Sequence, residues 1–140
     1  MPLATYPALF FTVALLVTTA YFLMGGLPLL ILEHDTPLDA RFIRGFFNVY
    51  CLAALVAATG TAVSYAFLGR PAFAIGAAAL ALAAALVRRT VIPEMDRLRE
   101  RILTNDAVAV RRFRQIHVGL LLSNVMQLAV VVWSLTTLSL

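Results

Sequence analysis

Four long apolar runs constrain the fold of this chain more than any other feature of its sequence. They cover residues 7–32, 45–68, 72–92 and 115–138, and each is long enough for a helix that crosses a bilayer. Hydrophobic residues make up 62% of the 140 residues and charged residues 13%, against roughly half and a quarter in soluble domains. The sequence therefore predicts an all-α integral membrane protein, an antiparallel four-helix bundle forming one domain over residues 1–140.

Glycine and proline interrupt the apolar pattern at two places. Gly25, Gly26 and Pro28 lie in the last third of the first run, where a kink or a local loss of helix is expected. Gly69 and Pro71 lie between the second and third runs and predict a tight turn there. The second and third helices are therefore expected to be antiparallel neighbours that approach closely through small residues.

The basic residues are all arginines, and their distribution predicts the topology. Ten of the eleven lie in or beside the two long connections, and Arg70 alone lies in the short one. By the positive-inside rule, both long connections face the cytoplasm and both termini lie outside, as in a protein of the bacterial inner membrane. In a soluble protein a net charge of +4 would suggest nucleic acid. Membrane topology explains the arginines here, so no nucleic-acid partner is predicted.

The connection over residues 93–114 is the one sizeable polar region of the sequence. Glu94 and Asp96 come first and arginines follow, which matches the preference for acids near a helix start and bases near its end. We expect a short interfacial helix here, or a cytoplasmic extension of the third span. Thr104 to Asp106 then supply a break and a new N-cap, so the fourth helix is predicted to begin near Asp106.

Polar residues inside the apolar runs fall on one side of each predicted helix. Unpaired amides are costly in hydrocarbon, so these polar seams are expected to turn either into the bundle or onto a partner. The positions are Thr12, Thr19, Gly26 and Glu33 in the first run, Arg44, Asn48, Cys51 and Thr59 in the second, and His117, Ser123, Asn124, Gln127 and Ser134 in the fourth.

The two histidines, His34 and His117, lie at the same end of the predicted bundle and so at similar depth. Imidazole is a common ligand of haem iron, copper and zinc, and Asn124 and Gln127 share the polar side of the fourth helix with His117. Two interpretations stay open. These four residues form a ligand or cofactor site with haem or a metal as the cofactor, or they are hydrogen-bonded polar residues that hold none.

Charged residues at the predicted cytoplasmic face suggest ion pairs and lipid contacts. Glu33, Asp35, Asp39 and Arg44 are expected to pair with the cluster of arginines at positions 88 and 89 and so to lock this end of the bundle. The arginines after residue 93 are expected to bind anionic lipid headgroups, at about 1 kcal/mol for each contact. The residues assigned to one or other role are Glu33, Asp35, Arg44, Arg88, Arg89, Arg111, Arg112 and Arg114.

The last 50 or so residues resemble the small transmembrane-205-like four-helix membrane proteins, a family of unknown function. The resemblance rests on Pro93-Glu94-Met95, on Phe113 with His117 four residues later, and on Asn124. It implies that Pro93, His117 and Asn124 are recurring positions. A looser similarity, to the anthrone-oxygenase-like membrane proteins, implies oxygenation of a hydrophobic aromatic substrate with His117 as the base.

The sequence favours a non-enzymatic function. It shows no nucleophile with a paired base, no phosphate-binding loop and no cysteine pair. We therefore expect an accessory or scaffold subunit that packs against a larger membrane complex, with lipid and either other subunits or further copies of the chain as partners. The alternative is a small membrane oxidoreductase, or a haem- or metal-binding protein, that uses His117 and His34.

Overall fold

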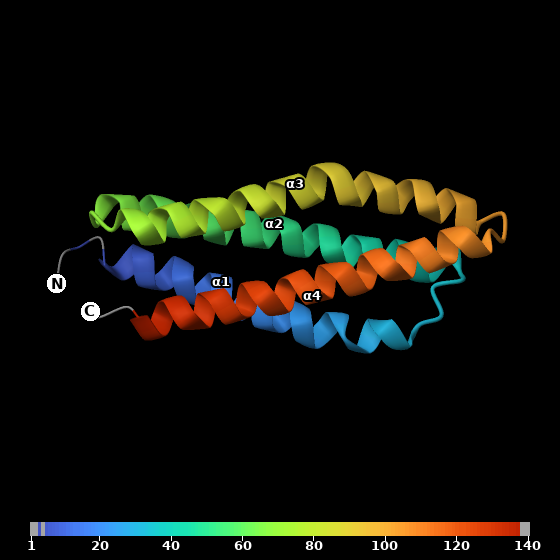
Figure 1. The fold of residues 1–140 in the computed structure, drawn as a ribbon, viewed down its shortest axis with the longest axis horizontal. Coiled ribbons are helices and arrows are strands. Elements are labelled where there is room, and N and C mark those ends of the chain that lie inside the picture. The colour runs from blue at the N-terminus through green and yellow to red at the C-terminus, as the bar shows by residue number, and fades with distance from the viewer. Residues whose placement is uncertain (1–2, 4, 138–140) are drawn as a thin grey trace.

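The computed structural model describes residues 3 and 5–137 and shows four helices packed lengthwise against one another (Figure 1). Each helix packs mainly on two others, in the ring order α1, α2, α3, α4. The predicted all-α four-helix bundle is confirmed, and no strand occurs within the described residues. The elements are α1 (Thr5–Gly26), η1 (Pro28–Ile31, a 3-10 helix), α2 (Pro37–Phe67), α3 (Pro71–Ile102) and α4 (Ala107–Thr137).

All four helices are long and apolar enough to cross a membrane. The start of α1, the α2–α3 turn and the end of α4 lie at one end of the bundle (Figure 1). The opposite end holds residues 33–44 and 94–114, with all seven acidic residues and eight of the eleven arginines. This end is called the arginine-rich end below, and its assignment to the cytoplasm stays a prediction.

Three helices extend beyond the predicted spans at the arginine-rich end. α2 begins at Pro37 instead of residue 45, because Thr36 caps it by accepting a hydrogen bond from the backbone N–H of Asp39. α3 continues through Pro93 to Ile102, which confirms the predicted extension of the third span. α4 begins directly after Asp106, as predicted. The apolar runs of α2, α3 and α4 are shorter than the helices because they cover only the part of each helix whose composition suits the hydrocarbon core of a bilayer.

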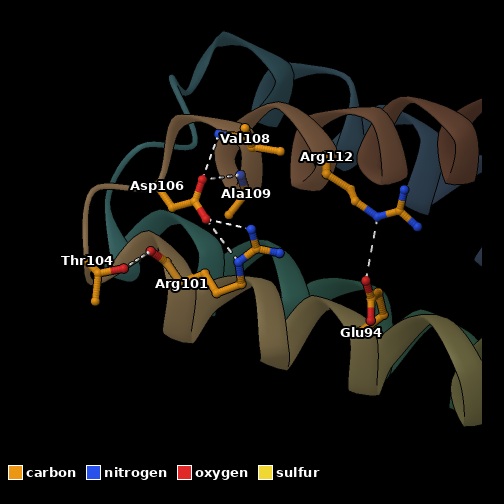
Figure 2. Close-up of polar contacts among 7 residues, drawn as sticks. All are labelled: Glu94, Arg101, Thr104, Asp106, Val108, Ala109 and Arg112. Carbon is orange, nitrogen blue, oxygen red and sulfur yellow. Dashed lines mark hydrogen bonds and ion pairs between the residues drawn. The ribbon is translucent and has the colours of Figure 1, made fainter.

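Asp106 shows why the fourth helix starts where it does. One carboxylate oxygen accepts hydrogen bonds from the backbone N–H groups of Val108 and Ala109, and the other accepts two from the Arg101 guanidinium (Figure 2). The hydrogen bonds from Arg101 hold the pKa of Asp106 below its ordinary value. The carboxylate thus caps α4 and ties it to the last turn of α3.

The first helix ends early, where the glycines and the proline predict a break. α1 stops at Gly26, and η1 follows. A Cβ on Gly26 would lie 2.5 Å from Leu121 Cδ2 of α4, so any larger residue here would require the Leu121 side chain to move. The N–H of Leu30 bonds to Leu27 instead of Gly26, which leaves the Gly26 carbonyl available to another partner.

The core differs between the two ends of the bundle. At the arginine-rich end, large side chains from every helix pack together and are almost completely buried, among them Phe47, Met95, Leu98 and Phe113. Toward the other end the buried cluster is small and contains two alanines, Ala57 and Ala58. The apolar segment of α3 is the least buried of the four, at 11% against 33% for α2.

Candidate functional site

A pair of buried histidines lies at the arginine-rich end of the bundle. His34 and His117 are both 0% exposed, and His34 Nε2 lies 2.8 Å from His117 Nδ1. The second nitrogen of His117, Nε2, lies 3.2 Å from the carbonyl oxygen of Gly26. Residues from the end of α1, the η1–α2 connection and α4 therefore meet at one point.

The local structure of the connection places His34 inside the bundle. Its φ is +63°, in the left-handed region that residues other than glycine seldom adopt, so its backbone conformation is strained. The neighbouring residues Glu33 and Asp35 are both exposed. The connection thus turns one imidazole inward and keeps both carboxylates in contact with solvent.

The hydrogen bonds determine where the protons lie in the neutral pair. A carbonyl oxygen can only accept, so His117 donates from Nε2 to Gly26, and its Nδ1 is left as an acceptor. His34 must then donate to it from Nε2. The remaining nitrogen, His34 Nδ1, is buried and has no hydrogen-bond partner among the described residues. The pair therefore has one free position for a further proton.

Aromatic rings surround the two imidazoles. Phe47 meets the His117 ring edge to face, with centroids 5.1 Å apart, and Phe113 lies 6.1 Å from the His34 ring. Burial lowers the pKa of His34 below the ordinary value of 6.5, and the positive charge of Arg114 lowers it further. The Leu32 backbone and the carboxylate of Asp39 act in the opposite direction. Because burial is the largest of these effects, the neutral ring is favoured.

The two amides proposed with the histidines lie elsewhere. Asn124 is seven residues beyond His117, about 10 Å further along α4. Gln127 accepts a hydrogen bond from the Tyr50 hydroxyl at 3.1 Å and donates one to Thr19 Oγ1, also at 3.1 Å. The structure therefore brings His34 and His117 together and places the amides in a second region. Of the predicted polar seams, Thr19 of α1 and Gln127 of α4 meet inside the bundle, whereas Thr59 of α2 and Ser123 of α4 are exposed.

The charged residues at this end form pairs that differ from the predicted ones. Arg44 bonds to Asp96 at 2.8 Å instead of joining the cluster at Arg88 and Arg89, and Arg88 donates to Asn48. The reason is the continuous helix α3, which carries Asp96 past the arginines and beside α2. Within residues 5–137, Glu33 and Asp35 form no ion pair.

Glu94 links the last part of α3 to α4. It lies 3.6 Å from the Arg112 guanidinium (Figure 2) and 3.8 Å from Arg97. Arg89, Arg111 and Arg114 are exposed, as an arginine that meets lipid headgroups must be. The sequence predicted that most of these charges lie at one end of the bundle. It did not predict that Asp96 and Glu94 of α3 pair with arginines of α2 and α4.

The donor geometry fits proton binding better than metal binding. Two nitrogens that share a tetrahedral metal lie about 3.3 Å apart, whereas these lie 2.8 Å apart with a hydrogen-bond donor facing an acceptor. A haem iron bound between two imidazoles needs about 4 Å, so the rings would have to separate. The described residues contain no group of three or more histidine, cysteine, aspartate or glutamate side chains suited to a metal.

The comparisons with known proteins found no matching family model, curated protein or solved structure. The resemblance to the transmembrane-205-like and anthrone-oxygenase-like families therefore stays a prediction from a few residues of the sequence.

Proposed function

We propose that this protein is a non-enzymatic integral membrane protein in which His34 and His117 form a proton-sensitive latch between the broken end of α1 and helix α4. The observation that carries the proposal is the buried 2.8 Å hydrogen bond between the two imidazoles, together with the free nitrogen of His34. A strained, fully buried histidine is a costly feature, and such features cluster at functional sites.

The latch is closed when both rings are neutral. His117 then binds the end of α1 through the Gly26 carbonyl, and His34 binds His117, so the η1–α2 connection is held against α4. Phe47 and Phe113 exclude water from the two bonds. In such dry surroundings a satisfied hydrogen bond is strong and an unsatisfied one is costly.

One added proton opens the latch. It binds at His34 Nδ1 and creates a buried cation, which desolvation and the positive charge of Arg114 both oppose. The backbone of Leu32 and the carboxylate of Asp39 offset only part of this cost, because burial has the larger effect. The charged ring is more stable in water, which it reaches when the connection at residues 33–36 leaves the bundle.

The direction of the pH effect follows from the lowered pKa. The open state has the ordinary pKa of about 6.5, and the closed state has a lower one, so the open state binds more protons as the pH falls below 6.5. The latch contributes its full stability above pH 6.5. It loses that stability as the pH falls from 6.5 toward the lowered pKa of His34. If the arginine-rich end faces the cytoplasm, the signal is cytoplasmic acidification.

Thermal unfolding of the detergent-solubilised protein between pH 7.5 and 5.5 tests the latch. The wild type is expected to lose stability as the pH falls, whereas His34→Asn is expected to respond weakly because it has no ring to protonate. Asparagine also tolerates the left-handed backbone at this position. His117→Asn provides a second variant that keeps His34 but removes its partner. An equal decline in wild type and His34→Asn contradicts the proposal.

A second candidate function, the role of accessory subunit, is favoured by the surface of α3. Gly76, Ala79 and Ala83 are exposed on this helix, whose apolar segment is only 11% buried. Small residues allow close helix packing in a bilayer, so α3 offers a surface for another membrane subunit or a second copy of the chain. Crosslinking in native membranes through a cysteine placed at Ala79 tests this role, and a chain that crosslinks to no protein contradicts it.

A further inference from the structure

A groove of about 300 Å³ lies between α3 and α4, with α2 as its floor. Leu80, Ala83, Ala84 and Val87 form its α3 side, and the exposed side chains of Met126 and Val130 lie at its α4 edge. All the described lining residues are uncharged. The groove therefore opens sideways into the region where lipid chains would surround the bundle, and a ligand that enters it comes from the bilayer.

Asn124 lines this groove, and its unpaired side chain indicates that the groove is a ligand site. Its side chain is 2% exposed, and neither its carbonyl oxygen nor its amide nitrogen makes a hydrogen bond to any described residue. A buried polar group without a partner costs on the order of 1–3 kcal/mol for each unmade bond, and native structures rarely leave both ends of an amide unpaired. The cost is greatest where no water is available.

The polar groups of Tyr50, Gln127 and Thr19 bond to one another, and Asn124 makes no hydrogen bond to them. The Tyr50 hydroxyl lies beside it but donates its proton to Gln127. Gln127 in turn donates to Thr19, and Thr19 donates to the carbonyl oxygen of Leu15 at 2.7 Å. One hydrogen of the Gln127 amide is not used in this chain of hydrogen bonds, but it makes no bond to Asn124. Within the described residues the Asn124 carbonyl oxygen therefore has no donor and its amide nitrogen has no acceptor, and a molecule in the groove can supply both.

We propose that the groove binds the un-ionised carboxyl group of a long-chain fatty acid, held by Asn124. A neutral carboxyl group carries one donor and one acceptor on a planar unit, and so does a primary amide, so the two form a pair of near-linear hydrogen bonds. An alcohol presents both functions from a single oxygen and fits less well. A carboxylate lacks the donor, and no lining cation would balance its charge.

The apolar surroundings suit the rest of the ligand. The alanines of α3 leave space beside Asn124, and the hydrocarbon tail leaves the groove over Met126 and Val130 to lie among the lipids. Cys51 and Phe47 close the floor from α2, and both are buried. The groove and the latch share no hydrogen bond, and Phe47 is the side chain that they have in common.

Photocrosslinking in liposomes tests the proposal with two matched probes, a diazirine-bearing palmitic acid and its methyl ester. The ester keeps the chain and the acceptor but has lost the donor. The wild type is expected to label about tenfold more strongly with the acid than with the ester, as loss of the hydrogen bond from the carboxyl O–H implies, with the crosslinks on α3 and α4 residues of the groove. Equal labelling by both probes overturns the proposal, and it does so without any variant.

Two leucine variants of α4 complete the experiment. Asn124→Leu keeps the size of the side chain and removes both hydrogen-bonding atoms, so labelling by the acid is expected to fall about tenfold to the level of the ester. Gln115→Leu removes an exposed amide of the same helix that does not line the groove, and its labelling is expected to equal that of the wild type. Undiminished labelling of a folded Asn124→Leu overturns the assignment to Asn124.

Discussion

The bundle contains two buried polar regions that contrast in how their polar groups are satisfied. At the arginine-rich end, His34 and His117 are 0% exposed and bond to each other and to Gly26, which leaves one nitrogen free. Midway along α4, Asn124 is equally buried but makes no hydrogen bond within the described chain. Helix α4 supplies a polar residue to both regions, so the difference comes from what packs against it.

The packing of α3 explains the contrast. Near the histidines, α3 contributes Ile92, Met95, Leu98 and Ile102, which are buried in the core between the helices. Beside Asn124 it contributes alanines, and a groove remains. The filled core holds the two histidines in contact with each other, whereas the groove leaves Asn124 beside open space. The two regions are therefore suited to different tasks, a conformational latch and a ligand site.

The largest expected effect compares the same substitution at the two regions. Leu98→Ala deletes a side chain that is 1% exposed and is expected to cost about 3 kcal/mol of unfolding free energy, because the filled core cannot collapse around the cavity. Leu80→Ala, on the same helix, enlarges a groove that is already open and is expected to cost less than about 1 kcal/mol. Unfolding in detergent measures both. Equal costs would contradict the contrast in packing.

Removal of a histidine is expected to have the next largest effect. His117→Ala leaves the His34 Nε2–H and the Gly26 carbonyl without partners, which is expected to cost about 2 kcal/mol of unfolding free energy above pH 7. Hydrogen exchange at the backbone amides of residues 33–36 provides a local measurement and is expected to accelerate. Unchanged stability and exchange would show that the two bonds do not hold the connection.

Asn124→Leu is expected to change the unfolding free energy in the opposite direction from His117→Ala. The wild-type amide makes no hydrogen bond that the substitution breaks, so the ligand-free protein is expected to be unchanged or more stable by up to about 1 kcal/mol. The measurement is unfolding in detergent after extraction of lipid. A loss of stability similar to that of His117→Ala would mean that Asn124 already has a partner, and the contrast between the two regions would disappear.

Single charges near His34 are expected to shift the pH response by the smallest amounts. Arg114 lowers the pKa of His34, so Arg114→Gln is expected to raise it and to move the loss of stability to higher pH. Asp39 raises that pKa, so Asp39→Asn is expected to move the loss to lower pH. The midpoint of the pH-dependent change in melting temperature measures both shifts. Shifts in the same direction would exclude the electrostatic explanation.

Much of the fold was predictable from the sequence because apolar runs and capping residues act locally. The four runs predicted the four helices, and Asp106 predicted where α4 begins. The sequence predicted too late a start for α2. Thr36 and Pro37 determine where this helix begins, and the first residue of the apolar run does not. The pairing of Arg44 with Asp96 was also missed, because it depends on how far α3 continues past Pro93.

The histidine pair was predictable only in part. The sequence places His34 and His117 at one end of the bundle, but their contact depends on the left-handed backbone of His34 and on the free carbonyl at Gly26. Helical periodicity cannot predict either feature, because both lie where regular helix stops. The separation of the histidine pair from the amides was not predictable either, because His117, Asn124 and Gln127 all fall on one side of a helical projection of α4.

The most direct test of the latch is ¹⁵N NMR of the imidazole nitrogens in the histidine-labelled protein. At pH 8 the account predicts two neutral rings, each protonated at Nε2, with a scalar coupling across the hydrogen bond from His34 to His117. At pH 5.5 it predicts protonation of His34 at Nδ1 and loss of the coupling. Two rings that titrate independently near pH 6.5, with no coupling at either pH, would contradict the account.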